Sequence, residues 1–456
     1  MELAKLIRTT DSSALVATRP LHITFASSEV APFSKTGGLG DVAASLPKAL
    51  ARRGHQVSVI TPLYKHLDPE KMRLARRLNT LEVPRRSKSQ NKAEAVVWEA
   101  RTDSGVRVFF LENEEYFGRD GLYGYDDRDF EDNAERFAFF SRAVVEHALQ
   151  FSTPVDIIHC NDWHTALAPI YRNHYYADEL SDVATVITLH NLAFQGKFPK
   201  KAADATGLPK KYAGTSELLT EDGEINFLKG GLLHAHAITA VSPTYAKEIR
   251  TADGGFGLHE VLEDRKDDLV GILNGADYSV WSPDIDRHIA VRYEEATLNG
   301  KRQNKARLQH EFGLPIRPTL PTLAMISRLT EQKGLDILIP ALKKLLKGFT
   351  DEQEGFQFVA LGDGKNKYSV ALEKLAKEYP KRVAFHPGYS EELAHRIQAG
   401  ADIMLVPSKF EPCGLTQIYA MRYGTLPIVH ATGGLADSVT DAGIDGKEGS
   451  GFVFHD

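Results

Sequence analysis

Short runs of apolar and mostly β-branched residues recur along the chain, each followed by a polar or glycine-containing loop and then by apolar positions at helical spacing. Residues 22–27 (HITFAS) read as a buried strand, and Val42, Leu46 and Leu50 fall on one face of a helix over Asp41–Arg53. Gly54 ends that helix, and residues 56–61 (QVSVIT) form the next strand. This alternation predicts a parallel sheet with right-handed crossovers.

The alternation occurs in two series. The first continues with strands at 155–160, 184–190 and 237–241, and the second predicts strands at 322–327, 356–361, 382–386, 402–407 and 426–430. We therefore expect an α/β protein of two Rossmann-like, doubly wound domains, residues 21–272 and 273–456, facing a central cleft. Ligand loops in such sheets lie at the carboxyl ends of the strands. The pattern of residues 62–150 is irregular and permits no assignment.

The length of 456 residues exceeds the usual size of one hydrophobic core and so predicts two or three domains. The chain has 55 Lys and Arg against 61 Asp and Glu, a net charge of −6, and no dense basic run. These features argue against nucleic acid or an anionic membrane as the main partner. No apolar run approaches the roughly 18 residues that a membrane span needs.

The cysteines and the first residues bear on the compartment. Two cysteines without a CxxC motif support neither a disulfide framework nor a zinc ribbon, so the reduced cytoplasm is expected. Residues 1–20 are too weakly apolar for a secretory signal and predict a poorly ordered tail. A weak transit peptide is the alternative, with a plastid as the compartment if the sequence comes from a plant, but Glu2 and Asp11 count against it.

The sequence TGGL-x-D occurs twice, at Thr36–Asp41 and at Thr432–Asp437, and only the first copy follows a lysine, Lys35. Each copy lies between a predicted strand and a predicted helix. Glycines such as Gly37 and Gly38 let backbone N–H groups approach an anion, which a helix N-terminus also favours. Lys35 would suit a diphosphate. A tight turn that binds nothing remains open for the first copy and is favoured for the second.

The segment SRLTEQKG, Ser327–Gly334, follows a strand of the second series. Arg328 and Lys333 would point at one anion, with Gln332 as a neutral donor. A guanidinium and an ammonium on one diphosphate would stabilise a departing nucleotide. Two solvated surface cations are the alternative.

The segment SKFEPCGLTQ, Ser408–Gln417, follows the strand at 402–407. Glu411, held by the following proline, offers an acceptor for sugar hydroxyls. The backbone N–H groups of Gly414, Leu415 and Thr416 would lie at a helix N-terminus. Cys413 lacks the histidine and asparagine of a nucleophilic cysteine and reads as a small packed residue of this loop.

In the first half, the segments HCNDWH and TLHN each end a strand, so Asp162 and His190 are expected near one edge of the sheet. A metal site formed by His159, His164 and His190 is conceivable, but no HExxH-like spacing supports it. The segment YDDRDFED, residues 125–132, contains a D-x-D. It reads as a solvated acidic loop or as a structural partner of Arg136 rather than a metal site.

Taken together, the motifs resemble those of bacterial glycogen synthases and plant starch synthases, in the same order along the chain. They are KTGGL, NDWH, TLHNLAFQG, AVSPTYAKEI, ILNGAD, SRLTEQKG, SKFEPCGLTQIYAMRYGTLPIV and TGGLAD, covering residues 21–456. The resemblance implies the GT-B architecture and transfer of glucose from ADP-glucose to the non-reducing end of an α-1,4-glucan. The family retains the anomeric configuration and uses neither metal nor cofactor.

The resemblance also implies residue roles. Lys35 would bind the donor, Arg328 and Lys333 would neutralise the diphosphate, and Glu411 would hold the glucose hydroxyls. Asp162 and His190 would line the sugar and acceptor side, and Asn274 would form the wall near the hinge. The further expected contacts to substrate are Gly37, Gly38, Gln332, Cys413, Gly414, Leu415 and Thr416.

One departure from the family is that its C-terminal helices have no counterpart before Asp456. Two alternatives stay open beside a catalytic ADP-glucose glucosyltransferase. One is a related GT-B enzyme that uses UDP-glucose, against which the pairing of KTGGL with FEPCG argues. The other is a non-catalytic glucan-binding protein, in which loss of the charged residues Arg328, Lys333 and Glu411 would be expected.

Overall fold

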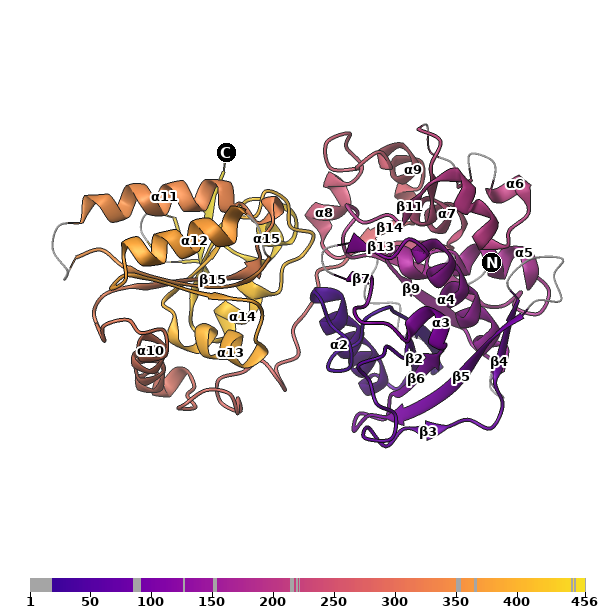
Figure 1. The fold of residues 1–456 in the computed structure, drawn as a ribbon, viewed down its shortest axis with the longest axis horizontal. Coiled ribbons are helices and arrows are strands. Elements are labelled where there is room, and N and C mark those ends of the chain that lie inside the picture. The colour runs from indigo at the N-terminus through magenta and orange to yellow at the C-terminus, as the bar shows by residue number, and fades with distance from the viewer. Residues whose placement is uncertain are drawn as a thin grey trace. The chain divides into compact units, whose positions relative to one another are not determined.

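The computed structural model describes residues 19–84, 92–125, 128–150, 154–213, 217–218, 220, 222–349, 354–364, 367–443, 446 and 448–455. The chain divides into two compact units (Figure 1). Unit 1 comprises Met1–Val241 and Ala246–Ile272, and unit 2 comprises Ser242–Tyr245 and Leu273–Asp456. In the described ranges, no helix is both long and apolar enough to cross a bilayer. Most of the predicted tail, residues 1–18, lies outside these ranges.

The sheet of unit 1 is built on parallel strands in the order β6-β2-β1-β9-β10-β13-β14. Their bounds are β1 His22–Ala26, β2 Gln56–Pro62, β6 Arg107–Glu112, β9 Ile157–Asn161, β10 Ala184–Leu189, β13 Ala237–Ala240 and β14 Leu269–Gly271. Numbered along the chain, the first six stand in the order 3-2-1-4-5-6, which is the Rossmann arrangement. The strands predicted from apolar runs are confirmed to within two residues at each end.

The irregular segment between residues 62 and 150 extends this sheet with antiparallel strands. Strand β5 (Lys92–Arg101) pairs with β6, and β3 (Ala75–Arg76) and β4 (Leu81–Pro84) pair with β5. Two small two-stranded antiparallel sheets add the remaining strands among the described residues of unit 1. They are β7 (Gly124–Tyr125) with β8 (Arg128–Asp129), and β11 (Lys197–Phe198) with β12 (Ile225–Asn226).

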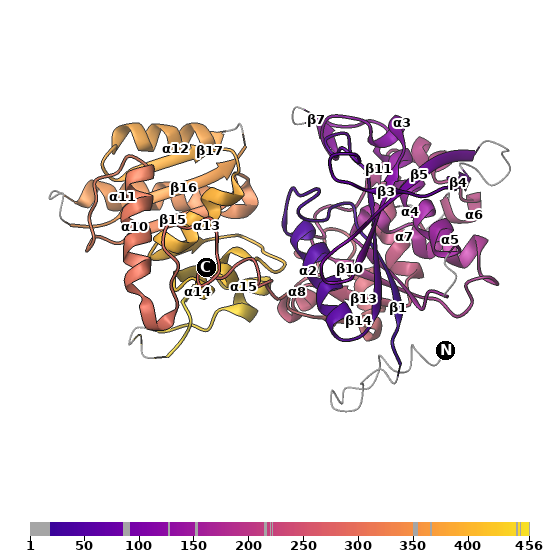
Figure 2. The ribbon, with the colours of Figure 1, turned by 90° about the horizontal axis from the view of Figure 1, so that it is seen from below.

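Helices cover both faces of the unit 1 sheet, with α2 on one face and α4, α5 and α7 on the other (Figure 2). Ala43 of α2 belongs to a buried cluster with Phe25, Val59 and Phe110 of the sheet. The α-helices are α2 Gly38–Arg52, α3 Glu114–Phe117, α4 Asn133–Ala148, α5 Ala168–Tyr175, α6 Lys210–Ala213, α7 Phe227–His234 and α9 His259–Asp264. Helix α8, Pro243–Glu248, has its first three residues in unit 2 and the rest in unit 1. Helix α2 begins three residues before its predicted start, so the first TGGL loop runs directly into it.

Unit 2 repeats the arrangement with an all-parallel sheet in the order β17-β16-β15-β18-β19-β20, again 3-2-1-4-5-6 along the chain. The strands are β15 Thr322–Arg328, β16 Gln357–Asp363, β17 Val383–Pro387, β18 Ile403–Val406, β19 Leu426–His430 and β20 Phe452–Phe454. The helices are α10 Asn299–Glu311, α11 Leu335–Gly348, α12 Lys367–Glu378, α13 Glu391–Gly400, α14 Thr416–Arg422 and α15 Gly433–Ser438. The prediction of two Rossmann-like domains is confirmed.

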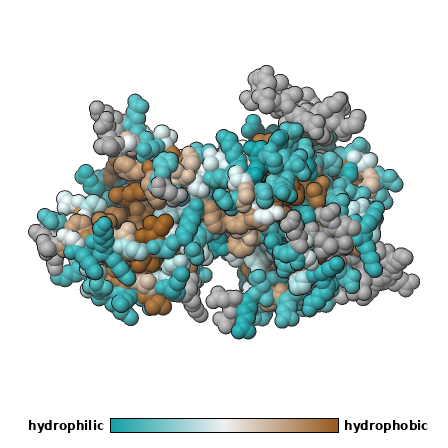
Figure 3. All heavy atoms as spheres, turned by 90° about the horizontal axis from the view of Figure 1, so that it is seen from above, coloured by the Kyte–Doolittle hydropathy of each residue, from teal (hydrophilic) through white to brown (hydrophobic). Residues whose placement is uncertain are grey.

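Each face of the unit 2 sheet has its own core, because successive residues of a strand point to opposite faces. Met325 of β15 packs in a cluster with Leu338 of α11 and Leu372 of α12, whereas its neighbour Ala324 lies in a cluster with Leu308 of α10. Hydrophobic side chains are also visible on the outer side of α11 and α12 in Figure 3. Ile337 and Leu345 of α11 and Val370 of α12 are exposed hydrophobic residues.

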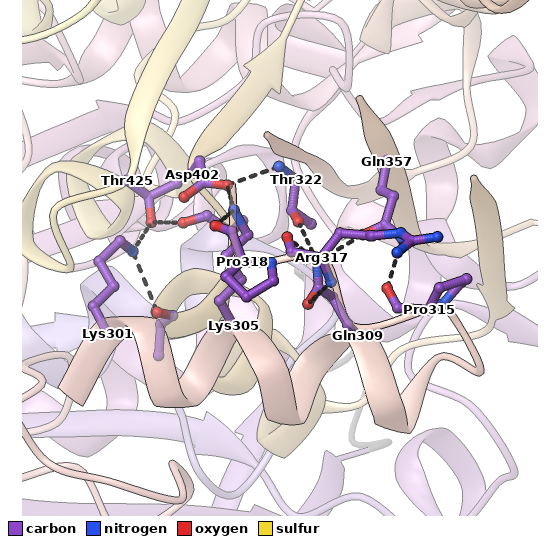
Figure 4. A network of polar contacts seen from close by, with 12 residues as sticks. Lys301, Lys305, Gln309, Pro315, Arg317, Pro318, Thr322, Gln357, Asp402 and Thr425 are labelled. Atoms are coloured by element: carbon purple, nitrogen blue, oxygen red, sulfur yellow. Dashed lines mark hydrogen bonds and ion pairs between the residues drawn. The ribbon is translucent and has the colours of Figure 1, made fainter. Parts of the chain in front are cut away.

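Helix α10 is fastened to the amino ends of the unit 2 strands, opposite the edge where ligand loops lie. Lys301, Lys305 and Gln309 recur every four residues and point from one side of the helix toward the sheet (Figure 4). The Lys305 ammonium lies 2.7 Å from the carboxylate of Asp402. The same carboxylate accepts a hydrogen bond from the backbone N–H of Thr322 at 2.7 Å, at the start of β15.

Candidate active site

The loops that the sequence singled out lie at the carboxyl ends of strands next to the topological switch points. These points fall between β1 and β9 in unit 1 and between β15 and β18 in unit 2. In doubly wound sheets, ligands bind at the carboxyl ends of the strands at such points. The loops follow β1, β9 and β10 in unit 1, and β15 and β18 in unit 2.

The first TGGL loop joins β1 to α2 and carries Lys35. The Lys35 ammonium lies 2.8 Å from the carboxylate of Asp41 in the first turn of α2. Nothing stands within 4 Å of the position that a Cβ on Gly37 would take, and the φ of −164° at Gly37 suits any residue. The fold therefore does not require a glycine there, and the open space suits a ligand. Gly38 follows Gly37 in the sequence and is the exposed first residue of α2.

Glu29 is the residue of this site that sequence reasoning missed. Its carboxylate accepts hydrogen bonds from the backbone N–H and the hydroxyl of Thr36, both at 2.6 Å, and from the N–H of Gly37 at 3.3 Å. Tyr123 donates its hydroxyl at 2.7 Å. The loop N–H groups that we expected to face an anion thus face Glu29 instead. The available signal was a charged residue in the otherwise neutral run FASSEV.

Asp162 begins the loop after β9 in a strained conformation, with φ 53° and ψ −172°. Such a backbone costs a non-glycine residue on the order of 1–3 kcal/mol and is concentrated at functional sites. The side chain is 7% exposed and accepts hydrogen bonds from the backbone N–H groups of His190 (2.7 Å) and Asn191 (3.4 Å). Burial raises the pKa of Asp162 to about 7 despite these two donors.

The bonds around His190 define which ring nitrogen can accept a proton or a hydroxyl. The Asn161 side chain donates from Nδ2 to the carbonyl of Ala26 at 2.9 Å, so its Oδ1 is the acceptor for His190 Nε2 at 2.9 Å. Nε2 therefore carries the hydrogen, and Nδ1 is the acceptor nitrogen of the ring. Burial lowers the pKa of His190 to about 3, which keeps the ring neutral. The structure thus brings Asp162 and His190 together as predicted.

In unit 2 the predicted residues Lys333 and Glu411 form an ion pair, with 2.5 Å between the ammonium and the carboxylate. Ser408 donates its hydroxyl to the same carboxylate oxygen at 2.8 Å. The two side chains are 17% and 10% exposed. Lys333 follows β15 and Glu411 follows β18, and these strands are neighbours in the sheet. The parallel pairing therefore joins two loops that are far apart in sequence.

Further bonds hold these two loops together. Lys409 donates its backbone N–H to the carbonyl of Gln332 at 2.8 Å, and the Gln332 amide donates to the carbonyl of Phe410 at 3.2 Å. The Lys409 ammonium also pairs with Glu331 (3.0 Å) and Asp336 (2.7 Å). Gln332, which we expected as a donor to an anion, is thus engaged in holding the loop that carries Glu411.

The structure also places the other residues of unit 2 that were predicted beside Lys333 and Glu411. Arg328 is the exposed last residue of β15. Burial raises the pKa of the Cys413 thiol to about 12, and Asn274 hydrogen-bonds that thiol through its backbone and its side chain. The thiol is therefore protonated and packed, as the sequence suggested. Asn274 contacts the loop that carries Glu411 at this point.

The segment after Cys413 turns into helix α14. Gly414 has φ 70°, a left-handed conformation that favours glycine, and a Cβ there would lie 2.5 Å from the amide oxygen of Gln417. Leu415 precedes the helix and Thr416 is its first residue. The N–H groups of a first helical turn have no intrahelical acceptor, which leaves them available to a ligand.

The second TGGL loop packs beneath the Glu411 loop. A Cβ on Gly434 would lie 2.3 Å from the Cα and the carbonyl oxygen of Cys413, and the Gly434 N–H donates to the carbonyl of Glu411 at 3.0 Å. The two TGGL copies therefore differ in the space around their glycines. The first copy is open at Gly37, whereas the chain itself fills the space at Gly434.

No group of three His, Cys, Asp or Glu side chains within the described ranges is placed to hold a metal ion. The Nε2 atom of His159 lies 2.6 Å from the Thr188 hydroxyl, and the ring of His164 stacks on Tyr123 with 4.6 Å between centroids. Together with the bond between His190 and Asn161, these contacts engage the three histidines separately.

The acidic segment 125–132 lies partly outside the described residues. The predicted pairing with Arg136 is wrong for its described part. Arg136 is fully buried and donates to the carbonyls of Tyr116 (2.6 Å) and Leu122 (3.0 Å). Asp132 pairs instead with Arg119, at 2.6 Å.

Known protein families and solved structures are similar to this chain over most of its length. Residues 22–264 match the family described as starch synthase catalytic domain, and residues 307–456 match glycosyl transferases group 1. Glycogen synthase from Anaeromyxobacter sp. (strain Fw109-5) is 47% identical over 440 residues, covering 96% of this chain and 89% of that protein. Glycogen synthase 1 from Geobacter sulfurreducens is 43% identical over 437 residues, covering 95% and 85%. The catalytic domain of starch synthase IV from Arabidopsis thaliana, bound to ADP and acarbose, superposes with a TM-score of 0.87 at 33% identity, covering 96% and 89%.

Proposed function

The chain belongs to the family of starch synthase catalytic domains, which has the GT-B fold. We propose that it is a glycogen synthase. It transfers glucose from ADP-glucose to the non-reducing end of an α-1,4-glucan and retains the anomeric configuration. The relatives named glycogen synthase support the polymer product, and the ADP and acarbose bound to starch synthase IV support the donor nucleotide and the glucan.

The observation that carries the proposal is the Lys333–Glu411 pair at the switch point of unit 2. A carboxylate with an ammonium beside it suits a sugar hydroxyl next to a phosphate, because the donor contains both groups. Lys333 would be shared between Glu411 and the diphosphate once the donor is bound. Arg328 would add a second positive charge at the end of β15. Two such cations stabilise the negative charge that develops on a departing nucleoside diphosphate.

The residues of unit 1 have matching roles in the proposal. Lys35 would exchange its bond to Asp41 for the phosphate and sugar region of the donor. His190 would accept a sugar hydroxyl at Nδ1, the nitrogen that its bond to Asn161 leaves as an acceptor. Asp162 would line the sugar and acceptor side, where its strained backbone fixes the carboxyl group.

The chemistry follows from this distribution of charge. The bond from the anomeric carbon to the phosphate oxygen breaks with oxocarbenium character, the diphosphate takes the electron pair, and the acceptor hydroxyl attacks the same face. The departing phosphate takes the hydroxyl proton. Glu411 is a positioning group rather than a covalent nucleophile, since Lys333 and Ser408 already hold its carboxylate. The protonated Cys413 thiol is a poor nucleophile.

Incorporation of labelled glucose into glycogen tests the proposal. We expect turnover with ADP-glucose well above turnover with UDP-glucose, and a loss of about 100-fold or more in Glu411→Ala. Glu311→Ala, which removes an exposed carboxylate of unit 2 paired with Arg396, is the control and should retain activity. Equal background incorporation by the wild type and Glu411→Ala would indicate a non-catalytic glucan-binding protein. A clear preference for UDP-glucose would overturn the donor assignment.

We also propose that the reaction needs no metal or cofactor and takes place in the cytoplasm. The cationic side chains Arg328 and Lys333 supply the charge that a divalent ion would otherwise supply to the diphosphate. Turnover should therefore persist in excess EDTA. Cys160 and Cys413 are both buried free thiols, which suits a reducing compartment.

A further inference from the structure

Glu29 and Tyr123 have no role in the function proposed above, yet they contact the loop that carries Lys35. We propose that Glu29 is a positioning residue, locked by Tyr123, that fixes this loop in the geometry needed to bind the donor. The inference rests on the proposed function, because it deepens the role of the same loop.

The Glu29 carboxylate is fully used by donors from two segments. Oε2 accepts from the N–H groups of Thr36 (2.6 Å) and Gly37 (3.3 Å), and Oε1 accepts from the hydroxyls of Thr36 (2.6 Å) and Tyr123 (2.7 Å). An ionised carboxylate only accepts hydrogen bonds, so it matches a set made of donors alone. Hydrogen bonds to a charged group are also shorter and stronger than neutral ones.

These bonds fix the backbone immediately before α2. Gly37, the N-cap of this 15-residue helix, provides no side-chain cap, and Glu29 accepts from the N–H of Gly37 itself and from that of Thr36 before it. A negative charge near a helix N-terminus is favourable. Because Thr36 is held by both its N–H and its hydroxyl, the position of the adjacent Lys35 backbone is restricted as well. Holding a binding group in advance reduces the entropy lost on ligand binding.

Tyr123 extends this control to the loop of Asp162. Its hydroxyl donates to Glu29 and lies 2.8 Å from the hydroxyl of Ser28, which can donate in return. Its ring stacks on His164 with 4.6 Å between centroids and 29° between planes. His164 lies in the short helix that follows Asp162. One side chain from the irregular segment before β7 thus contacts both loops at the carboxyl edge of the unit 1 sheet.

The burial of Glu29 argues that the contact serves geometry rather than stability. The residue is 3% exposed, and the groups that bond it are amides and hydroxyls rather than cations. Burying a carboxylate without an opposite charge costs free energy, so stability alone would favour a neutral side chain here. Burial raises the pKa of Asp162, and the negative charge of Glu29 raises it further.

The test is the steady-state kinetics of Tyr123→Phe and Glu29→Gln in the full chain, with ADP-glucose varied at saturating glycogen and then glycogen varied at saturating ADP-glucose. Both variants keep size and shape and remove only hydrogen bonding or charge. Unit 1 offers a matched control pair, since Tyr116 donates to Glu135 at 2.8 Å in the same way as Tyr123 to Glu29. The controls are Tyr116→Phe and Glu135→Gln.

We expect the KM for ADP-glucose to rise about tenfold in Tyr123→Phe and further in Glu29→Gln, since each loses a hydrogen bond involving a charged group. The KM for glycogen should stay within about twofold, and the controls should leave both constants unchanged. A purely structural role would lower the melting temperature of the variants and leave the donor KM unchanged, and that result would overturn the inference. If Glu29→Gln does not fold, Tyr123→Phe decides alone.

Calorimetric titration with ADP separates this inference from the proposed function. If the wild type binds ADP without transferring glucose, and the two variants bind ADP more weakly than the controls do, the positioning role holds and the transferase proposal fails. If the wild type transfers glucose and all four variants match it in donor KM and in ADP affinity, the positioning role fails and the transferase proposal stands.

Discussion

At the scale of single residues, Asp162 combines two unfavourable features in one position. Its backbone has a positive φ of 53°, and its carboxyl group is buried with a pKa raised to about 7 from the ordinary 3.8. A folded-state pKa above the unfolded value means that the carboxyl group favours folding only while it is protonated. Its contribution is fully present below about pH 4 and is lost as the pH rises toward 7.

Asp162→Asn should therefore stabilise the fold and lower the catalytic activity. Asn has the same shape as Asp and meets the same backbone strain, accepts from the N–H groups of His190 and Asn191 in the same way, and carries no charge. We expect a gain of about 1–3 kcal/mol at pH 8, growing between pH 4 and 7 and constant above, with kcat at least tenfold lower. Urea unfolding across this range and glucose incorporation at pH 8 provide the measurements.

Asp156→Asn is the control for that prediction, with the opposite sign. Hydrogen bonds from Arg19 and from the N–H of His22 outweigh burial and lower the pKa of Asp156. Its contribution is present above the ordinary pKa and is lost as the pH falls, so Asp156→Asn should destabilise the protein at pH 8. An Asp162→Asn gain that is the same at pH 4 and pH 8 would show that the buried charge is not its cause.

At the scale of elements, the two TGGL loops have one sequence pattern and two environments. Gly37→Ala adds a methyl group to open space, so stability should change by less than about 0.5 kcal/mol while donor kcat/KM falls several-fold. Gly434→Ala places a methyl group 2.3 Å from the Cα of Cys413, which must displace the loop of Glu411. We expect a loss of about 1–3 kcal/mol together with a lower kcat. Thermal melts and donor kinetics of both variants decide, and equal melts would contradict the distinction.

Lys301 of helix α10 should make the free energy of unfolding of unit 2 increase as the pH rises above neutrality. Burial lowers the pKa of Lys301 to about 7, although Asp402 raises it, and the ammonium donates to Thr425 at 2.7 Å. Since this pKa lies below the ordinary 10.5, the folded state loses the proton first, and stability should rise between about pH 7 and 10.

Urea midpoints at pH 7 and pH 9 measure this dependence. The rise should be present in the wild type and in Lys305→Gln, which keeps Lys301, and should be absent in Lys301→Gln. An equal rise in Lys301→Gln would assign the dependence to other groups.

These elements also show what the sequence could predict. Most of the parallel strands were predictable because they are buried runs of apolar residues, whereas β6 lies in the unassigned segment and β14 and β20 are short and incompletely buried. The pairing of β15 with β18 explains how Lys333 and Glu411 meet from neighbouring loops. The antiparallel strands β3, β4 and β5 were not predictable from the alternation of strands and helices, because they lie outside it. The role of Glu29 was hidden for a related reason, since its partner Tyr123 comes from that irregular region, 94 residues away.

At the scale of the whole molecule, each unit has its own hydrophobic core. Unit 1 contains Trp98 and Trp163, and unit 2 contains Trp281, the last of the three tryptophans in the chain. Trp281 is sandwiched between His395 (3.7 Å between centroids) and Tyr419 (4.1 Å), which holds the segment after β14 against α13 and α14. Because the cores are separate, we expect the units to unfold in separate steps.

We expect two calorimetric transitions, and Trp281→Phe should lower the free energy of unfolding of only one of them, by about 1–3 kcal/mol. The reason is that the substitution weakens the aromatic stack in unit 2 alone. The remaining fluorescence, from Trp98 and Trp163, should follow the unaffected transition. Trp98→Phe, which removes a 2.7 Å hydrogen bond to Glu112 in unit 1, should shift the other transition and leave the first in place. A single transition that both substitutions lower equally would mean that the two cores unfold as one, and stability effects in one unit could then not be assigned separately from those in the other.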